Sequence, residues 1–283
     1  MAVEPPVVSP TSLAEAYGLM RESEYRPIAG GTDLMVQLQA DVAEPPDAVI
    51  DLWHLDELRG VDYDGYDVSI GALTTYTELR RSPVIRARLP ALEEAAATVG
   101  AAQIQNRGTI GGNICNASPA GDTLPVLLAV DATFDVGSVD GERTIAAREF
   151  WTGYRQTALR DDELLLRVRF PVERGRYTRF RKVGTRAAQA ISKVVLALSY
   201  RTDGGAWSEV RVAMGSVAAT TIRVPRTEAV LEGAKPTEAV ADKAAHALAE
   251  EISPIDDVRS TAGYRRSVSA RVRHRLLREE GGW

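Results

Sequence analysis

The first part of the chain contains apolar residues at helical spacing behind a recognisable helix start. Leu13, Tyr17 and Met20 fall on one helical face, and Ser12 is followed three residues later by Glu15. This arrangement is a capping box, in which each side chain satisfies a backbone amide of the first turn. Short apolar runs typical of strands occupy residues 26–29, 48–52 and 68–72. The pattern therefore predicts strands alternating with helices.

Glycines separate several of these elements. Gly30 and Gly31 interrupt the run at 26–29, after which Thr32 or Asp33 can cap a helix over residues 34–38. Thr75 and Glu78 form a second capping box, and Pro90 opens an alanine-rich helix to about residue 99. Residues 100–121 follow neither a helical nor a strand period, so they predict a long ordered loop before the apolar run 124–130.

The second half of the chain has a different organisation. Alternating or continuous apolar runs predict strands over residues 132–136, 164–170, 177–183, 191–200 and 209–215. Helical spacing follows over residues 227–231, 239–252 and 264–277. Strands followed by segregated helices indicate an α+β unit. A proline and several charges near residues 171–176 mark the expected boundary, which predicts domains at 1–172 and 173–283.

Composition narrows the classes of function. Among 283 residues, 34 are basic and 39 acidic, giving a formal net charge of −5, so nucleic-acid binding is not expected as the main function. The longest apolar runs, such as 126–130 and 194–198, fall far short of the ~18 to 20 residues that span a bilayer. Residues 1–10 lack the basic and apolar segments of a secretory signal. We therefore expect no membrane span and no export.

The scarcity of metal ligands points to an organic cofactor. Cys115 is the only cysteine, so the chain alone can form no disulfide and hold no iron–sulfur cluster or cysteine-rich zinc site. The three histidines, His54, His246 and His274, are scattered, so they predict neither a metal site nor a hydrolytic triad. We expect Cys115 to be a packing residue in a reducing cytoplasm, and any redox chemistry to use an organic group.

Two glycine loops carry the strongest local chemistry. The first is Ala29-Gly30-Gly31-Thr32-Asp33-Leu34, and the second runs from Gly108 to Pro119 and contains Thr109-Ile110-Gly111-Gly112-Asn113. Glycine lets the backbone approach a ligand, so successive amide N–H groups can converge on phosphate oxygens, and the hydroxyl groups of Thr32 and Thr109 can add donors. Neither loop matches the dinucleotide fingerprint or a P-loop. Both loops are candidates for binding a phosphate-bearing cofactor.

The whole arrangement resembles the FAD-carrying subunits of molybdenum hydroxylases, such as those of the xanthine dehydrogenase and aerobic carbon monoxide dehydrogenase type. The stretch 109–122 is similar to their second flavin-binding loop and residues 29–34 to their pyrophosphate loop. The similarity continues in order through residues 70–75, 162–165, 181–186 and 257–265. It covers nearly the whole chain.

The resemblance implies a fold and a set of cofactor-binding residues. The fold is α+β, with a two-subdomain FAD-binding unit of the PCMH (vanillyl-alcohol oxidase-like) type followed by a small α+β C-terminal domain. The implied FAD contacts are Ala29, Gly30, Gly31, Thr32 and Asp33 around the pyrophosphate, Thr109, Ile110, Gly111, Gly112 and Asn113 from the second loop, and Asp122, Leu165 and Lys182. Asp122 would accept hydrogen bonds from cofactor hydroxyls, and either Lys182 or Arg181 would be the basic residue near the flavin.

The resemblance also implies partners. In the family a large subunit carries the molybdopterin cofactor, and a small subunit carries two [2Fe–2S] clusters. The FAD subunit passes the electrons to NAD⁺ or another acceptor such as a quinone, and needs no catalytic acid–base pair of its own. Val99 stands where animal relatives carry an aromatic residue. A stand-alone flavoprotein oxidase or reductase with the same FAD fold is the alternative, and an assembly subunit that has lost its flavin is a further one.

Overall fold

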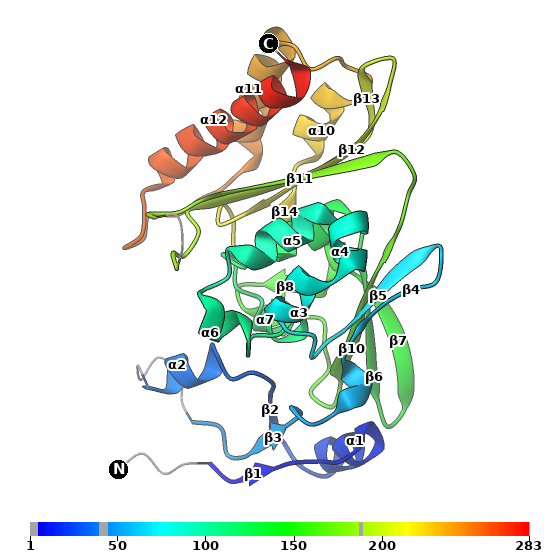
Figure 1. Cartoon of the computed structure of the whole chain (residues 1–283). Helices are drawn as coiled ribbons and strands as arrows, with labels where there is room; N and C mark the ends of the chain where they lie inside the picture. The colour runs from blue at the N-terminus through cyan, green and yellow to red at the C-terminus, as the bar shows by residue number, and fades with distance from the viewer. Residues whose placement is uncertain (1–4, 40–44, 187–188, 283) are drawn as a thin grey trace.

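The computed structural model describes residues 5–39, 45–186 and 189–282. Residues 1–4, part of the segment assessed above for an export signal, lie outside this range. The described chain forms four β-sheets, arranged with their helices in layers from the N-terminal sheet to the C-terminal helices (Figure 1).

The N-terminal sheet is small and parallel. It contains β1 (Val7–Val8), β3 (Val49–Asp51) and β2 (Arg26–Ile28), in that order, with α1 (Leu13–Glu22), α2 (Leu34–Gln39) and the short 3₁₀ helix η1 (Asp56–Leu58). The Ser12 hydroxyl accepts a hydrogen bond from the Glu15 amide, which confirms the predicted helix start. Buried Ala16 and Met20 of α1 share a hydrophobic cluster with Ile50 of β3. The predicted helix and strands of this region are confirmed.

A five-stranded antiparallel sheet forms the next layer. Its order is β4 (Val61–Tyr63), β5 (Asp67–Gly71), β10 (Leu164–Pro171), β6 (Thr133–Ser138) and β7 (Gly141–Ala146). Beside it lie α3 (Tyr76–Arg81), α4 (Pro83–Arg88), α5 (Pro90–Ala97), α6 (Ala102–Gln105), α7 (Ile110–Asn116), α8 (Leu124–Ala129), α9 (Ala147–Phe150) and the hairpin of β8 (Trp151–Gly153) and β9 (Gln156–Thr157). Because β10 pairs with both β5 and β6, it is the central strand of this sheet and belongs to the first half of the molecule.

The prediction that residues 100–121 form a loop without helices was wrong. Both α6 and α7 lie inside this stretch. Thr109 caps α7, since its Oγ1 accepts a hydrogen bond from the Gly112 amide at 3.0 Å, and Ala117 ends the helix in the left-handed conformation. Gly111 and Gly112 have low intrinsic helix propensity, so tertiary packing of buried Ile110 and Ile114 decides the conformation.

The C-terminal unit is a four-stranded antiparallel sheet with three helices. The strands are β11 (Arg176–Val183), β12 (Val194–Asp203), β13 (Ala206–Gly215) and β14 (Ile222–Arg223), and the helices are α10 (Pro225–Leu231), α11 (Glu238–Glu251) and α12 (Ala262–Gly281). The three helices predicted for this region are confirmed. The mixed α/β architecture predicted for the chain is therefore confirmed as well.

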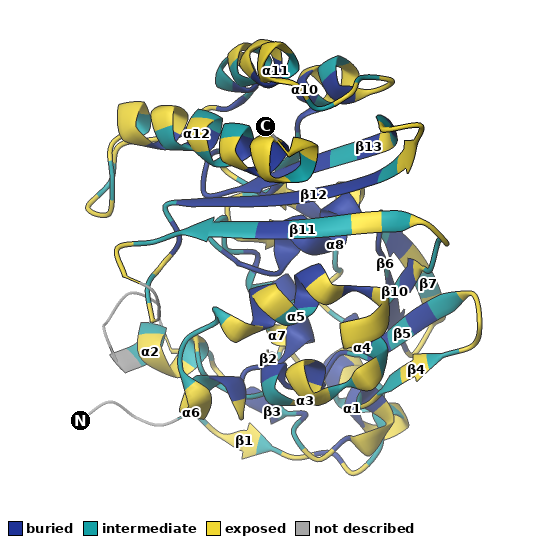
Figure 2. Ribbon diagram, turned by 45° about the horizontal axis from the view of Figure 1, so that its top comes forward, coloured by how far each residue is buried: buried dark blue, intermediate teal, exposed yellow. Residues whose placement is uncertain are grey.

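The C-terminal sheet is buried on both faces, and this joins the two halves. Alternate residues of β12 point in opposite directions: Val194 and Leu196 join the cluster under the C-terminal helices, whereas Val195 and Ala197 join the main cluster of the first half. Figure 2 shows β11–β13 between the C-terminal helices and α5 and α8. Burial on both faces explains why the first five residues of β12, 194–198, are all apolar.

Candidate functional site

The two glycine loops lie against each other. The first loop connects β2 to α2, and a Cβ atom added to Gly30 would overlap the carbonyl oxygen of Arg107. A Cβ on Gly108 would lie 3.3 Å from Thr32 Oγ1. Gly31 has φ +71°, which favours glycine. Because Gly30 and Gly108 have no side chains, two segments more than seventy residues apart in the sequence can lie in contact.

The first loop presents unpaired backbone donors. The amide N–H groups of Gly30, Gly31, Thr32 and Asp33 donate no hydrogen bond to any residue that the structure describes. The carbonyl groups of Gly31 and Asp33 accept bonds from the first turn of α2, at 3.1 and 3.0 Å. A run of four open amides in a turn is the geometry with which backbones bind anions.

The amides of Ile110, Gly111 and Gly112 in the second loop are already engaged. Ile110 N–H donates to the Thr74 carbonyl at 3.0 Å, and Gly111 N–H donates to the Ala72 carbonyl at 2.9 Å. Gly112 N–H donates to the Thr109 hydroxyl, as described above. A run of consecutive open amides, expected for both loops, is therefore present only in the first loop.

The glycines of the second loop differ in what surrounds them. Gly111 is buried, and a Cβ added there would lie 2.7 Å from Ala72, so this glycine is required for packing. Gly112 is exposed, and its Cβ would meet only the Thr109 hydroxyl at 3.0 Å. The Asn113 side chain accepts a hydrogen bond from the Thr123 hydroxyl at 2.7 Å. Of the candidate residues 109–113, Gly112 and Asn113 are therefore the two with exposed surface.

Arg155 connects the two loops and was missed by the sequence reasoning. It lies in the β8–β9 hairpin, where its Nη1 donates to Asn116 Oδ1 at 2.6 Å and lies 3.5 Å from Asp33 Oδ2. Trp151 anchors the hairpin by donating from Nε1 to the Ile114 carbonyl at 3.1 Å. The hairpin strands are too short to produce an alternating pattern, so the only sequence signal was the glycine at 153.

A buried polar cluster lies at the junction of the two halves. Lys182 Nζ lies 2.6 Å from Asp122 Oδ2 and donates to the Thr98 carbonyl at 3.0 Å. The side chains of Lys182 and Asp122 are only 11% and 8% exposed. The hydroxyls of Thr98 and Ser192 also donate to the Asp122 carboxylate. Thr98 and Ser192 carry no sequence signal, since isolated hydroxyl residues are common in loops.

The carboxylate of Asp122 is held by protein donors on both oxygens. Burial raises its pKa above the usual range, while the ammonium of Lys182 and the hydroxyls of Ser192 and Thr98 act in the opposite direction. We expected Asp122 to accept hydrogen bonds from cofactor hydroxyls. In this structure Asp122 accepts hydrogen bonds from three side chains of the protein, so it orients Lys182, and its contact with cofactor hydroxyls stays a prediction.

The structure distinguishes Lys182 from Arg181. Along β11, Arg179 and Arg181 point toward α12, where they pair with Glu280 and Glu279. Lys182 points the opposite way, to Asp122. Leu165 lies on β10 opposite Val136 and is buried in the main core. Of the two basic candidates, only Lys182 belongs to the buried cluster.

Cys115 has a structural role. Cys115 packs against the main hydrophobic cluster, and burial raises the pKa of its thiol to about 12.

Within residues 5–39, 45–186 and 189–282, no group of three or more His, Cys, Asp or Glu side chains is arranged to hold a metal ion. No helix in those same ranges has both the length and the apolar character needed to cross a bilayer.

Comparison with protein families covers both halves of the chain. Residues 2–173 match the family described as the FAD binding domain in molybdopterin dehydrogenase. Residues 179–279 match the CO dehydrogenase flavoprotein C-terminal domain.

Individual relatives align over almost their entire length. The chain is 32% identical to the carbon monoxide dehydrogenase medium chain of Hydrogenophaga pseudoflava, covering 95% of this chain and 94% of the relative. It is 34% identical to the glyceraldehyde dehydrogenase medium chain of Sulfolobus acidocaldarius, covering 91% of each. A solved carbon monoxide dehydrogenase from Hydrogenophaga pseudoflava superimposes with a TM-score of 0.93 at 32% identity, covering 97% of this chain and 96% of that one.

Proposed function

Since the chain belongs to the family of FAD-binding medium subunits of molybdenum hydroxylases, we propose that it binds FAD and transfers electrons from an iron–sulfur partner to NAD⁺ or another acceptor such as a quinone. The observation that carries the proposal is the row of four unpaired amides at 30–33 in the first loop. A pyrophosphate group would supply the acceptors that these amides lack, so the residues present fit this cofactor.

The pyrophosphate of FAD would be held mainly by the first loop. Ala29, Gly30, Gly31, Thr32 and Asp33 form the turn that carries the open amides and one hydroxyl. Arg155, 3.5 Å from Asp33, adds a positive charge beside this turn. A guanidinium and several amides together favour a group with two negative charges.

The second loop would contribute shape and a polar side chain. Thr109, Ile110 and Gly111 are buried and hold α7 in place through hydrogen bonds to neighbouring backbone. Among the candidates at 109–113, Gly112 and Asn113 are the two that are not buried, so they would contact the cofactor directly.

The flavin end would lie near Lys182, with Leu165 supplying a backbone contact. When bound, FAD supplies the electron-transfer chemistry of this subunit. Asp122 holds the Lys182 ammonium in one place, with Thr98 as its second acceptor. A fixed ammonium in a partly dry environment favours added negative charge in its neighbourhood.

The partners follow from the family. We propose a heteromeric complex with a large molybdopterin-binding subunit and a small subunit that carries two [2Fe–2S] clusters. The names of the relatives, which are medium chains of dehydrogenases, support this assembly. The single cysteine is compatible with our proposed location in the cytoplasm. We propose domains at 1–172 and 173–283, because β10 ends at Pro171, β11 begins at Arg176, and the boundary lies between these two strands.

Two measurements test the proposal. The purified chain, reconstituted with FAD, should show flavin absorption bands and retain one FAD per chain. Affinity purification from its native host should recover a molybdopterin protein and a cysteine-rich iron–sulfur protein. A colourless chain that takes up no FAD would overturn the proposal. A flavin-containing chain that turns over substrate without partners would favour the stand-alone oxidase or reductase.

A further inference from the structure

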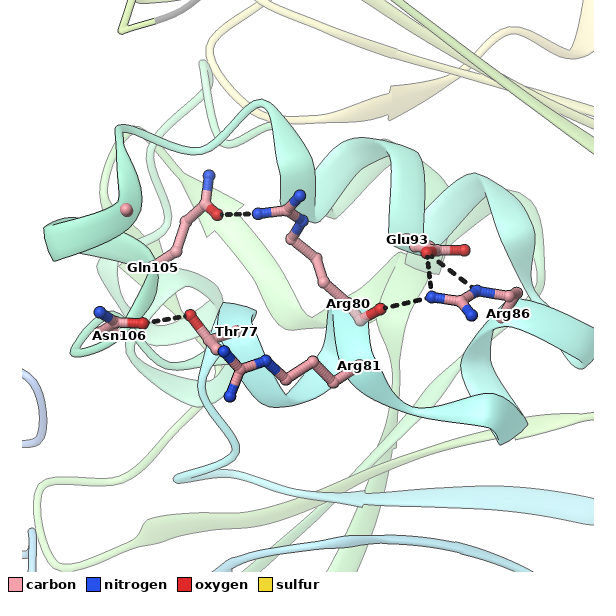
Figure 3. Close-up of a pocket in the computed structure, with 8 residues that line it drawn as sticks. Thr77, Arg80, Arg81, Arg86, Glu93, Gln105 and Asn106 are labelled. Atoms are coloured by element: carbon pink, nitrogen blue, oxygen red, sulfur yellow. Dashed lines mark hydrogen bonds and ion pairs between the residues drawn. The ribbon is translucent and has the colours of Figure 1, made fainter.

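A basic pocket lies apart from the residues assigned to FAD. It has a volume of about 410 Å³ and lies between α3, α4, α5 and α6 (Figure 3). Three arginines, Arg80, Arg81 and Arg86, line it, together with the single carboxylate of Glu93. Positive charge therefore exceeds negative charge inside the pocket.

The three guanidinium groups are not equally neutralised. Arg86 donates to Glu93 at 3.2 Å, which occupies the one carboxylate. Arg80 donates to the neutral side-chain oxygen of Gln105 at 2.6 Å. Arg81 forms no hydrogen bond or ion pair with any residue that the structure describes. Two cations thus lie in the pocket without an anionic partner.

The Arg80 side chain is held in place by a buried amide. Gln105 is only 4% exposed, and its Nε2 donates to the carbonyls of Ala97 and Val99 at 3.2 and 3.1 Å. These two bonds fix its oxygen as the acceptor for Arg80. A buried amide that orients an arginine without neutralising it maintains a positive charge at the pocket wall.

Further donors line the end of the pocket nearest to α6. The Thr77 hydroxyl donates to Asn106 Oδ1 at 2.6 Å, which leaves the amide group of Asn106 as a donor. Figure 3 shows Arg81 extending toward this end of the pocket, with Arg86 at the opposite end beside Glu93. Guanidinium and amide donors together fit the oxygen atoms of a phosphate group.

We propose that this pocket is a second anion site, which binds the phosphate groups of a small molecule. Its volume falls in the range of small-molecule sites, and its concave form suits a compact ligand. Two uncompensated guanidinium groups match the double charge of a phosphate monoester. The inference does not depend on FAD, because none of the pocket residues belongs to the two glycine loops or the Lys182 cluster.

Titration calorimetry with inorganic pyrophosphate tests this site in the FAD-saturated protein. We expect one saturable binding event per chain that weakens as the salt concentration rises. Arg81→Ala should weaken binding about tenfold or more, since a charge-assisted contact to phosphate is lost, and Arg81→Lys should restore part of it. ADP in place of pyrophosphate shows whether the site recognises phosphate alone or a nucleotide.

Arg88→Ala is the matched control. Arg88 lies on α4, stacks on Tyr63 outside the pocket and carries the same charge, so its removal should change pyrophosphate affinity by less than about twofold. No saturable binding, or equal weakening in both variants, would overturn the proposal. Release of FAD during the titration would also overturn it, because pyrophosphate would then occupy the first loop. If the chain takes up no FAD, the same pair of variants in the apoprotein still tests the pocket.

Discussion

Replacing Lys182 with methionine should destabilise the protein by leaving a buried carboxylate without its counter-ion. The Asp122 side chain is 8% exposed, and Lys182 is its one cationic partner among the residues that the structure describes. Ser192 and Thr98 would remain as donors but carry no charge. Breaking a buried ion pair by removing one partner costs about 3–5 kcal/mol. The two remaining hydroxyls place our expectation at the lower end, about 3 kcal/mol.

This loss is measurable as a change in melting temperature. At roughly 2–4 °C per kcal/mol for a chain of this size, Lys182→Met should lower Tm on the order of 6–12 °C. Arg181→Met is the neighbouring control, because its pair with Glu279 is 39% and 36% exposed. Surface pairs of this kind contribute about 0.2–1 kcal/mol, so the control should lower Tm only slightly.

The destabilisation should depend on pH in a defined direction. Burial raises the pKa of Asp122 in the folded state, and loss of Lys182 would raise it further. A carboxyl group with a raised folded pKa costs the most stability above that pKa, and the cost decreases as the pH falls from the folded pKa toward the lower unfolded pKa. Lys182→Met should therefore be most destabilised relative to wild type near pH 8 and less so near pH 5.

A double variant separates charge from packing. In Asp122→Asn with Lys182→Met the buried charge is gone, so the double variant should be more stable than Lys182→Met alone. If Lys182→Met melts within about 1 °C of wild type at pH 8, or if the two substitutions simply add, the assigned role of the pair is wrong.

Three further predictions concern the glycine loops. Gly112→Val should weaken FAD binding at least about tenfold by covering the exposed backbone, while Gly18→Val, at an open position of α1, should leave the affinity unchanged; equal affinities would remove Gly112 from the site. Arg155→Ala should weaken FAD binding about tenfold without loss of helical circular dichroism, and Arg155→Lys should be intermediate; unchanged affinity would show that Arg155 only joins the loops. Cys115 should react slowly with a disulfide reagent at pH 8, because a pKa of about 12 leaves roughly one thiolate in ten thousand; reaction at the rate of free cysteine would contradict its burial.

Local patterns in the sequence determined most of the secondary structure. Capping boxes and helical spacing located α1, α3 and the three C-terminal helices, because these signals act within a few residues. The glycine pairs marked both loops for the same reason. The long stretch at 100–121 was misread because the helix α7 contains two glycines and depends on packing against neighbouring segments.

The partners of the candidate residues were decided by the tertiary structure. Both glycine loops looked alike in sequence, yet in the second loop the amides of Ile110 and Gly111 donate to the carbonyls of Thr74 and Ala72, which lie more than thirty residues away. Arg155 itself carried no signal in the sequence, because its role depends on a hairpin that reaches both loops and that only the glycine at 153 marked.

Arg181 and Lys182 illustrate the difference between what the local sequence and what the tertiary structure determine. The sequence by itself determined that neighbouring residues of β11 point to opposite faces, since side chains alternate along any strand. Only the packed sheet decided which face meets α12 and which meets Asp122. The orientation of the sheet depends on long-range contacts that bury both of its faces, and no local pattern encodes such contacts.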